Sequence, residues 1–243
     1  MRRMKTLKAR KAAKDERRNR RKAKSRRRPD ELRLHPLGGS FEPGLAERIL
    51  DAFEGFDPTA PWPDIAPRIV PVLKRAHHPY PAEMAPLHIR VPPGIWTGFG
   101  IDLGPAFSHV SQALLDGWGI DRPTLLGTAL TNLTDLVRRE RPIVDAVPID
   151  GVEVIAIQGQ GWGSSLVLVP ELLRPILGGT PRVLLAPVRN TLLALPADVD
   201  DGLAVDLWQA IAHGAHDELD VDPLRWTGST VALLSDTSLG LPN

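Results

Sequence analysis

The fold is decided by the stretch RVLLAPVRNTLLAL, residues 182–195. Two apolar runs, 182–187 and 191–195, flank Val188, Arg189 and Asn190, a spacing typical of two strands joined by a short turn. Residues 152–158, VEVIAIQ, alternate between apolar and polar positions and predict a further strand. We therefore expect these three segments to form the central sheet of the protein.

Amphipathic helices are expected to flank this sheet. The clearest begins after Asp121, which can cap it, and ends before Pro142. Other helices are expected from Leu45 to Gly55, at 108–118 and at 200–216, and a short or proline-kinked helix is expected near 64–76. Strands are expected as a hairpin within 87–103 and near 229–234. Residues 164–179 are expected to form a strand followed by a short helix. The predicted fold class is therefore α+β, with a central mixed or antiparallel sheet and flanking amphipathic helices.

The composition excludes several classes of protein. With 243 residues, 42% of them apolar, the chain can bury a sizeable core. It has no cysteine, which excludes disulfides and thiolate metal sites and is typical of a reducing compartment. The sequence contains no run of about 18 apolar residues, and no apolar segment follows the basic amino terminus as in a secretory leader. We expect a cytoplasmic protein without a membrane span.

The formal net charge of +1 conceals a separation of charge along the chain. Residues 1–28 hold 16 lysines and arginines and only two acids, a net charge of +14, whereas the rest holds 14 basic and 27 acidic residues, a net charge of −13. Three prolines and a Gly-Gly pair mark 29–43 as a linker. The predicted organisation is a basic tail at 1–28, a linker at 29–43 and a single α+β globular domain at 44–243.

The tail has few large apolar residues, so we expect it to be disordered alone, or helical on a polyanion. Clustered lysines and arginines bind phosphates without regard to base sequence, which makes RNA, DNA or the ribosome the natural partners. The candidate polyanion-binding residues are Arg17, Arg18, Arg20, Arg21, Lys22, Lys24, Arg26, Arg27 and Arg28. Three alternatives stay open: a solubilising arm, an arm that folds back on the acidic body, or a start codon assigned too far upstream.

Motifs that carry chemistry are weak in this sequence. Gly159 to Ser165, GQGWGSS, follows a predicted strand but lacks the third glycine of a dinucleotide fingerprint and the lysine of a P-loop, so a glycine-rich turn is the better interpretation. His213 and His216 precede several acids but lack the HExxH spacing of a zinc site. We expect no metal and no cofactor, and no catalytic residue can be assigned.

The order of segments resembles the YtpQ-like family of bacterial proteins, which has no established activity. The resemblance rests on FGIDLGPAFSHVSQALLDGWGID at 99–121, ALTNL at 129–133, GSSLVLVPELL at 163–173 and VLLAPVRNTLLAL at 183–195, and would cover about 62–234. It implies an intracellular bacterial α+β protein. The polar residues of the matched blocks are candidates for a shared ligand-binding cleft: Asp102, Asn132, Ser164, Ser165, Arg189 and Asn190. For each of them, a cap, a turn or a satisfied buried polar group is the structural alternative.

Two functional hypotheses follow. The first is a non-enzymatic interaction protein whose acidic domain binds a protein or small ligand while the tail holds it on a polyanion. The second is a small hydrolase or transferase that uses Ser164, Ser165 and Arg189, which requires those side chains to converge in one pocket.

Overall fold

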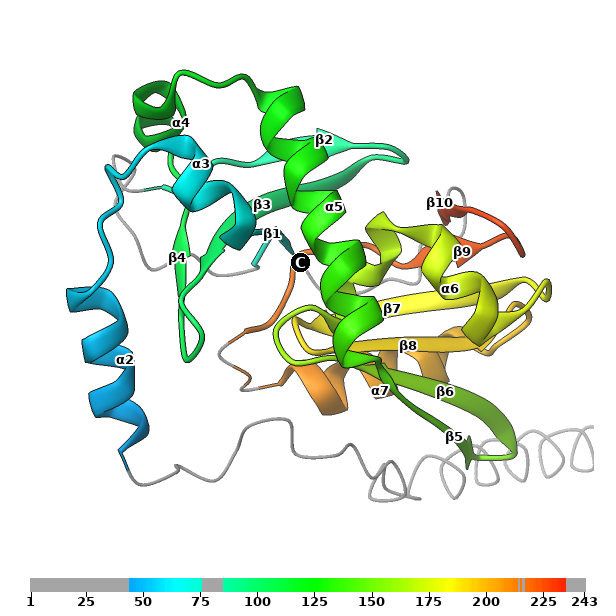
Figure 1. Cartoon of the computed structure of the whole chain (residues 1–243). Coiled ribbons are helices and arrows are strands. Elements are labelled where there is room, and N and C mark those ends of the chain that lie inside the picture. Colours follow the sequence, from blue (N-terminus) through cyan, green and yellow to red (C-terminus); the bar gives the residue numbers. More distant parts are fainter. Residues whose placement is uncertain (1–43, 76–84, 214, 216, 235–243) are drawn as a thin grey trace, which may run out of the picture.

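Two antiparallel sheets form the framework of the protein (Figure 1). The computed structural model describes residues 44–75, 85–213, 215 and 217–234. The tail and the linker predicted at 1–28 and 29–43 lie outside the described residues. The predicted α+β class is confirmed, and the sheets are antiparallel rather than mixed.

The smaller sheet is built around one long strand. Its strands are β1 (Ile69–Leu73), β2 (Ile89–Val91), β3 (Ile95–Asp102) and β4 (Phe107–His109). β3 pairs with β1 along one side, and with β2 and β4, one after the other, along its opposite side. Thus β1 and β2 are both edge strands, and the hairpin predicted within 87–103 is confirmed as β2 and β3.

The larger sheet has six strands, in the order β10-β9-β7-β8-β6-β5. They are β5 (Ile143–Ile149), β6 (Val152–Gln158), β7 (Arg182–Val188), β8 (Thr191–Pro196), β9 (Leu224–Trp226) and β10 (Val231–Leu233). The three strands expected at 152–158, 182–187 and 191–195 are confirmed as its centre, β6 to β8. The register of β7 shifts between Leu185 and Val188, around Pro187, which has no N–H to donate to the ladder.

Helix α5 (Arg122–Glu140) lies across both sheets. Asp121 caps it, because its carboxylate accepts a hydrogen bond from the Thr124 N–H at 2.9 Å. Hydrogen bonds from the hydroxyl and the N–H of Thr124 hold the pKa of the Asp121 carboxyl below its ordinary value. Leu125 packs under the small sheet, whereas Leu133 packs in a core that includes residues of the large one. The helix predicted after Asp121 is therefore confirmed, and it joins the two sheets.

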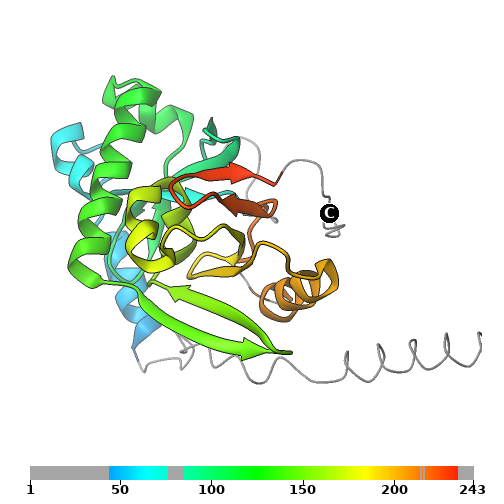
Figure 2. The ribbon, with the colours of Figure 1, turned by 90° about the vertical axis from the view of Figure 1, so that its right-hand side faces the viewer.

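Helices cover both faces of the large sheet, as Figure 2 shows. α7 (Asp201–Ala212) packs Leu207 and Trp208 on one face, and α6 (Pro170–Leu177) packs Leu173 and Leu177 into the core on the other. α4 (Gln112–Trp118) packs on the small sheet through Leu115. Of the helices in the described part of the chain, none combines the length and apolarity needed to cross a bilayer.

Three segments differ from the prediction. The helix expected near 64–76 is a short one, α3 (Trp62–Ile65) with a 3₁₀ turn η2 (Ala66–Arg68), and is followed by strand β1. Pro67 and Pro71 lack the N–H groups that a continuous helix needs, and the β-branched IVPVL run favours a strand. The strand expected after Ser164 is instead a 3₁₀ helix, η4 (Gly163–Leu168). The helix expected at 108–118 begins only at Gln112, because 107–109 pair with β3.

Helix α2 (Leu45–Glu54) is confirmed where the first helix was expected, but it buries little. None of its residues is fully buried, and Leu50 and Phe53 are exposed. Figure 1 shows it standing apart from the sheets. The amphipathic pattern therefore predicted the helix correctly, but the expectation that the helix flanks the sheet with its apolar side buried is wrong.

Candidate functional site

Three of the six candidate site residues meet where the loop after β6 contacts the turn between β7 and β8. The Ser164 hydroxyl and the Ser164 N–H both donate to the carbonyl of Arg189, at 2.9 and 3.0 Å. On the same turn, the side-chain oxygen of Asn190 accepts from the Gly161 N–H at 2.7 Å, and its carbonyl accepts from the Gly159 N–H at 3.0 Å. Ser164, Arg189 and Asn190 thus fasten two loops together.

Ser165 turns in another direction. Its hydroxyl donates to the carbonyl of Pro71 on β1 at 3.1 Å. Ser164 and Ser165 are both fully buried, with none of their surface reaching solvent. Because each hydroxyl is bonded to a main-chain carbonyl and shielded from water, neither is placed to attack a substrate.

The glycines of the GQGWG loop allow close packing. Gly163 lies so near the β7–β8 turn that a Cβ there would stand 2.2 Å from the carbonyl oxygen of Asn190. A Cβ at Gly159 would stand 2.5 Å from the ring of Trp162, which is buried and donates its Nε1–H to Glu140 at 2.9 Å. Since the N–H groups of Gly159 and Gly161 are already bonded to Asn190, the loop is a structural turn and not a phosphate cradle.

Arg189 also contacts the small sheet. Its guanidinium carbon lies 5.3 Å from the centre of the Phe107 ring on β4, a cation–π distance. Phe107 also packs on the other side of the GQGWG loop, because a Cβ at Gly161 would meet its ring at 3.0 Å. The turn that carries Arg189 therefore joins the two sheets.

Asn132 donates hydrogen bonds at the outer edge of strand β1. From α5 its side-chain amide donates to the carbonyls of Ala66 and Ile69, at 2.7 and 2.8 Å. Ile69 and Pro71 alternate along β1 with residues whose backbone groups bond to β3, so the Ile69 and Pro71 carbonyls point away from β3. They accept hydrogen bonds from Asn132 and Ser165, respectively. Pro71 has no N–H to leave unpaired there. Two candidate site residues thus complete the hydrogen bonds of an edge strand.

A first hollow lies beside this edge and brings Asp102 and Asn132 together. Its volume is about 190 Å³, and its charged lining residues are Arg68, Asp102, Asp135 and Arg139. Arg68 donates to the Asp102 carbonyl at 2.8 Å, and the Asp102 carboxylate accepts from the Gly104 N–H at 2.7 Å. Ligand pockets for organic molecules usually exceed about 300 Å³. This hollow is suited to water or to a very small molecule that carries one positive and one negative group.

We expect Asn132→Ala to lower the free energy of unfolding by about 2 kcal/mol, because it leaves the Ala66 and Ile69 carbonyls without their donor. Urea titration followed by circular dichroism measures this. Thr131→Ala, at the adjacent exposed position of α5, is the matched control and should change stability little. A stability equal to wild type would show that the Asn132 amide has no structural role.

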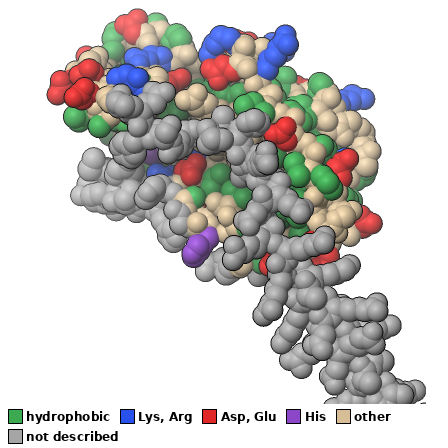
Figure 3. Space-filling view, turned by 90° about the horizontal axis from the view of Figure 1, so that it is seen from below, with side chains coloured by type: hydrophobic (Ala, Val, Ile, Leu, Met, Phe, Trp, Pro, Cys, Tyr) green, Lys and Arg blue, Asp and Glu red, His purple; other side chains and the backbone are tan. Residues whose placement is uncertain are grey.

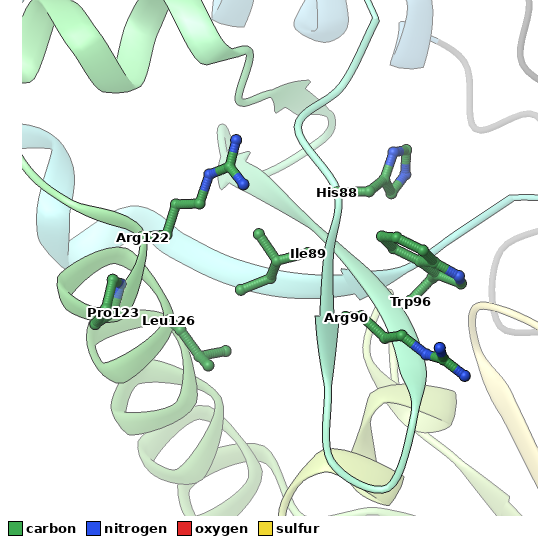
Figure 4. A pocket seen from close by; sticks show the side chains of 7 residues that line it. All are labelled: His88, Ile89, Arg90, Trp96, Arg122, Pro123 and Leu126. Atoms are coloured by element: carbon green, nitrogen blue, oxygen red, sulfur yellow. The ribbon is translucent and has the colours of Figure 1, made fainter.

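A second hollow, which the sequence did not predict, lies between the edge strand β2 and the start of α5 (Figure 4). Its volume is about 440 Å³, within the range of ligand pockets. It is lined by His88, Ile89, Arg90, Trp96, Arg122, Pro123 and Leu126. Arg90 and Trp96 face each other across β2 and β3, a pairing that depends on the register of the hairpin. The sequence shows the tryptophan at position 96 within the predicted hairpin, but not that its ring is exposed.

The remaining candidates lie in part outside the described residues. This holds for all nine polyanion-binding candidates of the tail and for His216. Within the described ranges, no three acidic or histidine side chains converge as metal ligands do. Comparisons with family models, curated proteins and solved structures found no match to this chain. The resemblance to the YtpQ-like family stays a prediction.

Proposed function

We propose that this chain is a non-enzymatic binding protein of the cytoplasm. Its basic tail contacts a polyanion, either nucleic acid or the ribosome, and its folded part binds a protein or a small ligand. The observation that carries the proposal is the division of charge, with +14 in residues 1–28 and −13 in the rest. Such a tail attracts a phosphate backbone by releasing its counterions.

The folded part supports a separate role for the tail. The described residues hold 13 basic and 22 acidic side chains, a net charge of −9. Figure 3 shows acidic side chains at several separate places on one face. A body with this net charge does not attract a polyanion from a distance, so in this proposal the tail supplies the long-range attraction.

A binding role is favoured over the hydrolase or transferase alternative. That alternative needs a nucleophilic hydroxyl in a pocket that a substrate can enter. Ser164 and Ser165 are fully buried, and each donates to a main-chain carbonyl. These hydrogen bonds give both serines a structural role, which favours the binding proposal over the hydrolase or transferase alternative.

The test is to replace the nine tail candidates Arg17, Arg18, Arg20, Arg21, Lys22, Lys24, Arg26, Arg27 and Arg28 by glutamine in the full chain. Fluorescence anisotropy with a labelled single-stranded RNA, between 50 and 200 mM salt, measures binding. We expect wild-type affinity to fall steeply with salt. In the variant, affinity at 100 mM should fall at least about 100-fold, and the salt slope should flatten by about 0.7 for each phosphate that the variant no longer binds.

The matched control removes cations from the body instead. Arg174 and Arg225 are exposed, and replacing both by glutamine should leave RNA affinity nearly unchanged. If wild-type protein ignores RNA at 50 mM salt, or if the tail variant binds as tightly as wild type, the proposal is wrong.

A further inference from the structure

The hollow between β2 and α5 combines an aromatic face with positive charge. Trp96 is 47% exposed, whereas the chain's largest buried side chains include Trp162 and Trp226, at 2% and 0%. Figure 4 shows Trp96, His88 and Arg90 grouped on one side of β2, with Ile89 and Leu126 on the other. An indole left in water beside an arginine offers a flat surface on which another ring can stack.

Both arginines of the hollow are held in place without losing their charge. Arg90 donates to the Gly94 carbonyl at 3.1 Å, and Arg122 donates to the side-chain oxygen of Gln112 at 2.8 Å. Within the described ranges, neither guanidinium has a carboxylate at salt-bridge distance. Elsewhere on the body Lys74 and Arg182 are paired with Asp220 and Glu153. The hollow therefore carries unneutralised positive charge on a body whose net charge is negative.

The strand positions keep this arrangement open. β2 is an edge strand, and in the described part of the chain β3 is its only strand partner. Gly98 on β3 leaves room for the His88 ring, since a Cβ there would lie 3.2 Å from it. The Trp96 ring and the two arginines are thus fixed by the sheet and by α5 rather than by a loop.

We propose that this hollow is a stacking site for a base of single-stranded nucleic acid. The base stacks on Trp96, and Arg90 beside it binds the flanking phosphate, whereas Ile89, Leu126 and Arg122 line the part of the hollow on the other side of β2. This inference rests on the proposed function and names its partner. The tail attracts any polyanion, and the hollow selects chains whose bases are unpaired.

An acidic peptide fits these observations less well. Its carboxylates would pair with the two arginines, but it would leave the exposed indole face unused. A nucleotide uses both features, and about 440 Å³ is enough to accept one base with part of its sugar. The +14 tail of the same chain points to the same class of partner.

The experiment uses the full chain and compares wild type with Trp96→Ala and Trp96→Phe. The probes are a labelled single-stranded 12-mer, as RNA and as DNA, inorganic polyphosphate, and poly-glutamate as a competitor. We expect Trp96→Ala to weaken binding of both 12-mers by between about five-fold and 100-fold. Trp96→Phe keeps an aromatic face and should restore most of the affinity. Polyphosphate has no base, so its affinity should not change.

The controls separate this site from a general loss of structure. Leu50→Ala removes an exposed apolar side chain from α2 and should leave every affinity unchanged. Trp96→Thr keeps a residue that favours strands, and it serves as the non-aromatic variant if the alanine variant does not fold.

Other outcomes overturn this inference, the tail proposal, or both. The site is not a stacking site if Trp96→Ala leaves both 12-mers bound as tightly as before, or if it weakens polyphosphate equally. It is a peptide site if poly-glutamate displaces the 12-mer and binds less well to Trp96→Ala. If the tail proposal alone fails, neutralising the nine tail cations will not change 12-mer affinity while Trp96→Ala still weakens it. If the stacking site alone fails, binding stays salt-dependent and insensitive to Trp96.

Discussion

Trp162→Ala is expected to lower the free energy of unfolding by about 4 kcal/mol. The indole is 2% exposed and packs in the core that the two sheets share. Its ring fills the space over Gly159, and its N–H bonds Glu140 at the end of α5. Alanine would leave a cavity at the point where the helix, the GQGWG loop and the large sheet meet, and the surrounding backbone is too well bonded to collapse into it.

Two further variants show which part of the indole matters. Trp162→Phe keeps a ring but loses the hydrogen bond to Glu140, so we expect it to lower the free energy of unfolding by about 2 kcal/mol. Trp96→Ala is the matched control at an exposed position and should cost less than about 1 kcal/mol. Guanidinium titration with near-ultraviolet circular dichroism measures all three. Equal losses at Trp162 and Trp96 would contradict the assignment of Trp162 to the core.

Gly163→Ala is expected to lower the free energy of unfolding by about 3 kcal/mol, although it adds only a single methyl group. That methyl carbon would lie 2.2 Å from the carbonyl oxygen and 2.7 Å from the carbonyl carbon of Asn190. Both neighbours are backbone atoms, so no side chain can rotate to make room. The β7–β8 turn must shift, and its hydrogen bonds to Gly159 and Ser164 weaken with it.

The same substitution in α5 should have the opposite sign. A Cβ at Gly127 meets nothing within 4 Å, and alanine favours a helix over glycine by about 1 kcal/mol. Gly127→Ala should therefore raise the midpoint of thermal unfolding, and Gly163→Ala should lower it. A neutral result at Gly163 would mean that the turn is not held against η4.

The elements that were predicted correctly are those whose boundaries and apolar pattern can be recognised in the local sequence alone. Asp121, Pro142 and the apolar face between them predict α5 without knowledge of what it packs on. The β6, β7 and β8 segments were predicted because their apolar runs are long and have recognisable boundaries. Four strands were missed, namely β1, β4, β5 and β9. β1 contains a proline that only an edge position tolerates, and β5 is half exposed, so neither resembles a central strand.

The site was less predictable because its residues act through tertiary contacts. The sequence indicated Ser164, Arg189 and Asn190 together, and they do meet, but only the fold shows that Ser164 bonds a backbone carbonyl. Asn132 meets β1 across 63 residues of chain. No local pattern could place Trp96 opposite Arg90, because the register across the Pro92-Pro93-Gly94 turn decides which side chains share a face.

The bonded outer edge of β1 bears on how copies of this protein meet one another. The Ile69 and Pro71 carbonyls are already bonded to Asn132 and Ser165, so a strand of a second molecule would have to displace these bonds to pair there. One end of the large sheet is β5, where Ile143 and Val144 are exposed. Strand addition is thus opposed at β1 by occupied carbonyls and at β5 by the side chains of Asp145 and Pro148.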